Sequence, residues 1–106
     1  MEQRLLRDIV ALRDVTGAAL LDEEGFVLFS EPMHDDSVQS LGKAIALLDP
    51  NIATKRVTLN GENGTIIVEQ LRGKRVLVVR CNTSANLGKI RHSVDTNAVT
   101  FNALIP

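Results

Sequence analysis

The sequence predicts an α+β fold whose elements follow the order α-β-β-α-β-β-β-α. The chain has 106 residues, the size of one domain, so residues 1–106 are expected to form a single unit. Segments near both ends place apolar residues at helical spacing, and short apolar runs between them are separated by turns that contain glycine. Several of these runs are apolar on both faces, which indicates a sheet that is covered on both sides.

The first helix is expected from about Glu2 to Arg13. Its apolar residues recur at helical spacing, and the acidic Glu2 suits the positive N-terminal end of the helix dipole. Thr16-Gly17 is expected to break this helix, because glycine is a poor helix former.

A hairpin is expected next, with strands at Ala18–Leu21 and Phe26–Phe29. The turn Asp22–Gly25 between them places Gly25 at a position that tolerates positive φ. Neither strand alternates cleanly between apolar and polar residues, which suggests that a partner or a second subunit covers part of the sheet.

A second helix is expected from about Asp36 to Leu48, capped by Asp35 or Asp36 and ended by Asp49-Pro50. Gly42 lies inside it, and small residues on a helix allow another backbone to approach closely. The sequence therefore permits a helix–helix contact across a dimer, or a glycine that is merely tolerated. The apolar residues of this helix are Val38, Leu41, Ile45 and Leu48.

Three further strands are expected at Arg56–Asn60, Thr65–Glu69 and Arg75–Cys81. The turns between them are Gly61–Gly64 and Arg72–Lys74. The first of these strands alternates most clearly, so it is expected at an edge of the sheet. The third has the strongest strand pattern in the chain.

The last helix is expected from about Ala85 to Ala103, with N-cap candidates in Asn82-Thr83-Ser84. Its apolar stripe has spacings of three and four residues and consists of Leu87, Ile90, Val94, Ala98 and Phe101.

The sequence contains no pattern that points to catalysis. Gly61-x-x-Gly64 lacks the Lys-Ser/Thr pair of a phosphate loop and is interpreted as a turn. Cys81 is the only cysteine, so it forms no intramolecular disulfide and is expected to be buried and inert. Glu31, His34 and the two aspartates that follow are interpreted as a solvated cap instead of a metal site. We expect no enzyme, no catalytic residue, no metal and no cofactor.

Composition limits the classes of partner. A net charge of −1 and an aromatic fraction of 3% argue against nucleic-acid binding. No apolar run approaches the roughly 18–20 residues that span a bilayer, and the N-terminal residues do not resemble a signal peptide. We therefore expect a cytoplasmic protein with no membrane span.

Charge is distributed unevenly along the chain. Residues 1–53 carry four basic and ten acidic side chains, and residues 54–106 carry eight basic and three acidic ones. Two readings follow. In the first, the folded chain has two oppositely charged faces that orient a partner or a second copy. In the second, folding interleaves the two halves and cancels the asymmetry.

Two segments resemble the Roadblock family, named for the dynein light chains, and specifically its prokaryotic regulators of small GTPases. One is the hairpin VTGAALLDEEGFVL at residues 15–28, and the other is TSANLGKIR at residues 83–91. The second is the more specific, through its ANLG-x-IR stretch. The resemblance extends from about Arg4 to about Val99.

The resemblance implies a Roadblock-like or profilin-like sandwich, with a five-stranded antiparallel sheet between helices. The first and last helices would cover one face and the middle helix the other. It also implies a homodimer, which would be isologous, so that each patch meets its own copy. The interface residues expected on this basis are Leu41, Gly42, Ile45, Arg56, Val57, Thr58 and Leu59.

For function, the resemblance implies a non-enzymatic homodimeric adaptor that binds a small Ras-like GTPase and stimulates its GTP hydrolysis. A constitutive scaffold subunit of a larger complex, without nucleotide dependence, is the alternative. A small-ligand sensor is a third hypothesis, because α/β domains of this size can enclose a pocket.

Overall fold

The computed structural model describes residues 1–31, 56–62, 64–71, 73, 75–83 and 85–104. Within them the chain forms helix α1 (Glu2–Val10), strands β1 (Val15–Leu21) and β2 (Val27–Glu31), strands β3 (Arg56–Gly61), β4 (Gly64–Gln70) and β5 (Val76–Cys81), and helix α3 (Leu87–Leu104). The helix expected at 36–48 lies outside the described residues, as do its interface candidates Leu41, Gly42 and Ile45.

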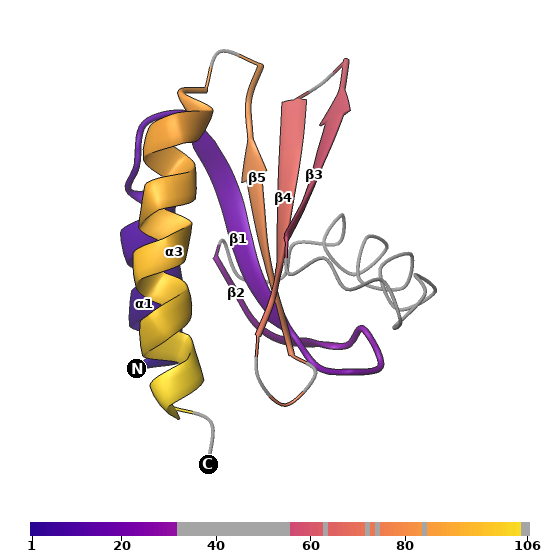
Figure 1. Cartoon of the computed structure of the whole chain (residues 1–106), viewed down its shortest axis with the longest axis vertical. Helices are drawn as coiled ribbons and strands as arrows, with labels where there is room; N and C mark the ends of the chain where they lie inside the picture. Colours follow the sequence, from indigo (N-terminus) through magenta and orange to yellow (C-terminus); the bar gives the residue numbers. More distant parts are fainter. Residues whose placement is uncertain (32–55, 63, 72, 74, 84, 105–106) are drawn as a thin grey trace.

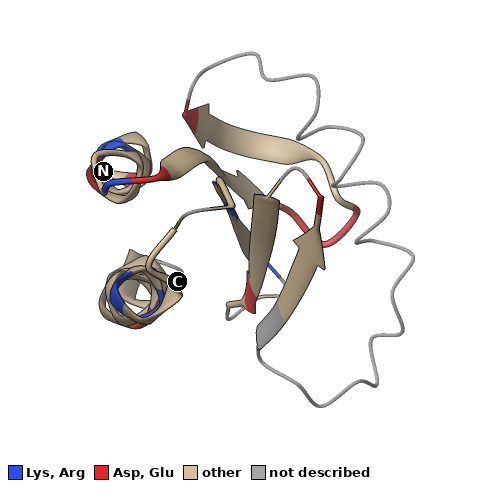
Figure 2. Ribbon diagram, turned by 90° about the horizontal axis from the view of Figure 1, so that it is seen from above, with Lys and Arg blue, Asp and Glu red and all other residues tan. Residues whose placement is uncertain are grey.

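The five strands form one antiparallel sheet with the order β2-β1-β5-β4-β3. Helices α1 and α3 lie side by side on the same face of this sheet (Figures 1 and 2). The predicted α+β class and the antiparallel sheet are therefore confirmed, and so is the placement of the first and last helices on one face. β3 is an edge strand, as its alternating sequence predicted, and β5 lies at the centre.

The main core lies between the helices and the sheet. Apolar residues recur at helical spacing in α1 and α3, so each helix presents one continuous apolar stripe to the strands. Burial of such side chains contributes about 1.5–3 kcal/mol each for the larger aliphatics. The most deeply buried members are Leu6, Ile9, Leu20, Ile67, Leu77, Val79, Ile90, Val94 and Phe101.

The opposite face of the central strands is also buried. Ala19 and Leu21 of β1 and Val78 of β5 form a second cluster there, against which Ile66 and Val76 pack. Ala19 pairs with Val78 across the two strands. Both faces of β1 and β5 are thus shielded from water, which explains why their sequences are apolar without alternation.

Several element boundaries differ from the sequence-based expectations. Helix α1 ends at Val10, earlier than Arg13, because the backbone tightens and the N–H of Leu12 donates to the carbonyl of Ile9. Asp14 then adopts a left-handed φ of 69°, which no helix can continue. Strand β1 starts at Val15.

The role assigned to Thr16-Gly17 was wrong. These residues lie inside β1, at a bulge that shifts the register with β5 between Val15 and Gly17. The Arg80 side chain lies over the Cα of Gly17, so a larger residue here would require the flexible end of that side chain to move. A Cβ at this position would stand 2.6 Å from an Arg80 guanidinium nitrogen.

Phe101 tests the packing of α3 against the sheet. We expect Phe101→Ala to lower the free energy of unfolding by about 3–5 kcal/mol, because the side chain is fully buried in the main core. Val99→Ala is the matched control on the same helix, since Val99 is 72% exposed, and should change stability by no more than about 0.5 kcal/mol. Equilibrium urea unfolding measures both, and equal losses for the two variants would contradict the described helix face.

Candidate functional site

The structure places the described interface candidates on edge strand β3. Among the described strands, β3 pairs with β4 alone and stands at one end of the strand order. The hydroxyl of Thr58 accepts a hydrogen bond from Arg91 of α3 at 3.4 Å, so Thr58 lies on the helix-covered face. Leu59, the next residue, lies on the opposite face beside its pairing partner Ile66 and is 44% exposed. Arg56 and Val57 belong to the same strand.

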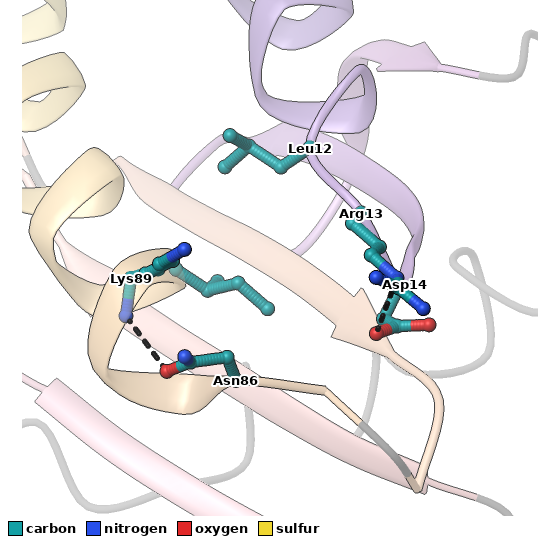
Figure 3. Close-up of a pocket in the computed structure, with 6 residues that line it drawn as sticks. Leu12, Arg13, Asp14, Asn86 and Lys89 are labelled. Atoms are coloured by element: carbon teal, nitrogen blue, oxygen red, sulfur yellow. Dashed lines mark hydrogen bonds and ion pairs between the residues drawn. The ribbon is translucent and has the colours of Figure 1, made fainter.

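A second feature, which sequence reasoning missed, is an open cavity of about 320 Å³ where the α1–β1 loop meets the start of α3. We call it the corner pocket. Leu12 and the buried Ile90 supply its apolar part, whereas the cations Arg13 and Lys89 stand at its rim (Figure 3). Asp14 and Asn86 complete the lining.

Hydrogen bonds to Asn82 hold one wall of the corner pocket in place. The Asn82 backbone N–H donates to the Asp14 carbonyl at 2.9 Å, and its side-chain amide donates to the Asp14 carboxylate at 3.0 Å. Arg13 lies 3.9 Å from the other carboxylate oxygen. A left-handed non-glycine residue persists where surrounding contacts fix it, and these contacts do so for Asp14.

The ANLG-x-IR stretch builds the other wall. The Asn86 side-chain oxygen accepts a hydrogen bond from the Lys89 backbone N–H at 3.3 Å, which is the geometry of an N-cap. Asn86 is therefore the cap, and the candidates in Asn82-Thr83-Ser84 were misplaced. After the cap, Lys89 lines the pocket and Ile90 packs in the main core. Arg91 donates a hydrogen bond to Thr58 of β3.

Cys81 is the last residue of β5 and precedes Asn82. It is buried, as the sequence predicted. Burial, and next the negative charge of Asp14, raise the pKa of the Cys81 thiol above its ordinary value of 9.0. The thiol is therefore protonated at neutral pH and is a poor nucleophile.

The structure bears on whether the uneven charge along the sequence forms oppositely charged faces or is cancelled by folding. The acidic β1–β2 turn at 22–24 and Arg75 of the β4–β5 turn lie at the same end of the sheet, because Leu21 pairs with Val76 (Figure 1). Folding therefore brings acidic and basic segments together at that end. At the opposite end, the rim of the corner pocket carries two cations and one carboxylate.

The described part of the chain shows neither a metal-ion cluster nor a membrane-spanning helix. In that part, no three His, Cys, Asp or Glu side chains lie together in a way that could hold a metal ion. His34, Asp35 and Asp36 fall outside it. None of the described helices is both long and apolar enough to cross a membrane.

Solved structures share this fold over nearly the whole chain. The Roadblock/LC7 domain from Streptomyces avermitilis has a TM-score of 0.84 at 13% sequence identity, covering 97% of this chain and 96% of that one. Myxococcus xanthus MglB has a TM-score of 0.80 at 15% identity, covering 96% and 92%. Profilin IA of Acanthamoeba castellanii is also similar, with a TM-score of 0.68, 20% identity and 98% coverage of both chains.

These likenesses confirm the Roadblock-like and profilin-like fold that the sequence resemblance implied. No protein-family model and no curated protein matches the sequence. One fold hosts many unrelated functions, so the likeness establishes architecture and leaves function to be argued from surfaces.

Asn86 tests the wall of the corner pocket. We expect Asn86→Ala to lower the free energy of unfolding by about 1 kcal/mol, because α3 loses its side-chain cap. Asn86→Ser keeps an oxygen that can cap and should retain most of the wild-type stability. Thermal and urea unfolding compare the two variants, and an alanine variant as stable as the serine variant would show that Asn86 does not cap the helix.

Proposed function

We propose that this chain is a non-enzymatic, cytoplasmic homodimeric adaptor that binds a small Ras-like GTPase and regulates its nucleotide cycle. The sequence resembles the prokaryotic Roadblock regulators through residues 15–28 and 83–91, and the fold is shared with MglB. The observation that carries the proposal is the placement of the more specific of these segments. Arg91 of ANLG-x-IR donates a hydrogen bond to Thr58 of β3 at 3.4 Å, so this segment contacts the strand that would join two copies.

β3 is suited to pair with its own copy. Its outer edge faces no strand of the described sheet, and Leu59 leaves apolar surface exposed beside it. Two copies related by a two-fold axis could place their β3 strands antiparallel and join their sheets, which is an isologous contact. One strand pair covers less than the roughly 1,600 Å² of a standard interface, so Leu41, Gly42 and Ile45 are proposed to add to it.

A regulator of this kind needs no catalytic group of its own. Phosphoryl transfer depends mainly on positioning and on charge stabilisation, so a partner that fixes the switch loops of a GTPase can accelerate hydrolysis. Such a partner must bind the two nucleotide states with different affinities, since equal affinity shifts no equilibrium. Nucleotide-independent binding would instead favour the alternative, a constitutive scaffold subunit.

Calorimetry with a purified small Ras-like GTPase from the same genome tests the regulator. We expect at least tenfold tighter binding to the GTPase carrying a non-hydrolysable GTP analogue than to the GDP form, a difference of about 1.4 kcal/mol. Single-turnover GTP hydrolysis should then be faster with the adaptor than without it. Equal affinity for both forms, or binding to neither, would contradict the regulator for that GTPase and favour the constitutive scaffold.

Leu59 tests the two-fold contact separately. We expect Leu59→Lys to convert a dimer to a monomer in sedimentation velocity, because it places a charge beside its own copy at the apolar edge. Position 59 is partly exposed, so a lysine there keeps its charge in water, and circular dichroism checks that the variant is folded. Val99→Lys is the control on the outer surface of α3 and should remain dimeric, whereas a dimeric Leu59→Lys variant would place the interface elsewhere.

A further inference from the structure

The corner pocket has the chemistry to receive an apolar side chain carried on an acidic segment. Its interior is apolar at Leu12 and Ile90, and its rim carries the exposed cations Arg13 and Lys89. The one carboxylate, Asp14, is engaged by Asn82 and Arg13. The volume of about 320 Å³ is larger than the roughly 150 Å³ of an engineered cavity that binds benzene, so volume does not exclude a phenyl ring.

The chain itself presents such a segment at its other end. The β1–β2 turn, Asp22-Glu23-Glu24-Gly25, is acidic, and it is followed by Phe26, whose ring side chain is 61% exposed. An exposed phenylalanine beside three carboxylates complements an apolar pocket with a cationic rim in both polarity and charge. Phe26 belongs to neither described core cluster, so its ring is open to a contact from outside.

The acidic turn is held rigid before any contact is made. The Asp22 carboxylate accepts hydrogen bonds from the backbone N–H groups of Glu24 and Phe26, each at 2.9 Å. The Asp22 N–H donates to the Phe26 carbonyl, also at 2.9 Å, and Gly25 adopts the φ of 86° that the turn requires. Preorganisation of this kind lowers the entropy lost on binding.

β1 separates the donor and the acceptor. Asp14 precedes its first residue and Asp22 follows its last, so the pocket and the turn lie at opposite ends of the sheet (Figure 1). One copy cannot fill its own pocket with its own turn. A second copy displaced along the β1 direction can.

We propose that Phe26 of one copy docks in the corner pocket of the next, with Glu23 and Glu24 beside Arg13 and Lys89. The contact is heterologous, head to tail, so it leaves one pocket and one turn unoccupied at the ends of each pair and permits further copies to add. It uses no residue of β3 and is independent of the two-fold contact proposed above. Its small area makes it weak, so it forms at high protein concentration.

Sedimentation velocity over a rising concentration series at low ionic strength tests the contact, in the Leu59→Lys background and in wild type. We expect the weight-average sedimentation coefficient to rise with concentration in both. Phe26→Ser and Lys89→Glu should each weaken association at least tenfold. The matched controls Val99→Ser and Arg4→Glu alter an exposed apolar residue and an exposed cation away from the pocket and should associate as their parent does.

Mixing the two defective variants separates a head-to-tail contact from any symmetric one. Phe26→Ser retains an intact pocket and Lys89→Glu retains an intact turn, so in the Leu59→Lys background their mixture should form a one-to-one pair that grows no further. The double variant Glu24→Lys with Lys89→Glu should regain association. Concentration-independent sedimentation of the parent, or unchanged association of Phe26→Ser, would overturn the proposal and leave the two-fold contact untouched.

Discussion

Burial of both faces of β1 and β5 is the constraint on which the rest of the structure depends. On one face Leu20 meets Leu77, and on the other Ala19 meets Val78, and all four residues are buried. Such a strand pair needs cover on both sides. Helices α1 and α3 provide it on one side, and their apolar stripes are placed to match.

The same constraint determines where polar groups can lie. With both faces of the central strands largely apolar, Arg80 of β5 excepted, charge and hydrogen-bonding capacity lie mostly at the strand ends and on the edge strands. At the start of β1, Asp14 is tied to Asn82 at the end of β5, which closes the sheet beside α3. At the end of β1, Asp22 organises the turn with its own carboxylate. Among the described residues, the two ends of the sheet and the β3 edge are thus candidate surfaces for recognition.

The sequence predicted what depends on periodicity and missed what depends on tertiary contact. Helical spacing identified Ile90, Val94, Ala98 and Phe101 as the buried face of α3, and glycine predicted the positive φ at Gly25. Thr16-Gly17 was mistaken for a helix breaker, because a glycine that accommodates a crossing Arg80 side chain resembles one that ends a helix. The corner pocket could not be predicted from the sequence because its two walls, at 12–14 and 86–90, lie more than 70 residues apart in the chain. The only local signal was Asn86, three residues before Lys89, the spacing of an N-cap to its third helical residue.

Contacts at the β3 edge and at the ends of β1 would have different consequences, because their symmetry differs. An isologous contact through β3 is satisfied by one partner, so it ends at a dimer. A heterologous contact between Phe26 and the corner pocket leaves free ends, and a dimer carries two of each end. If two dimers were linked through two such contacts, the second contact would form within the complex at a high effective concentration. The overall affinity would then exceed that of a single contact without any new interface. A regulator built on this fold would then respond steeply to its own local concentration, while its single-copy fold, fixed by β1 and β5, stays the same.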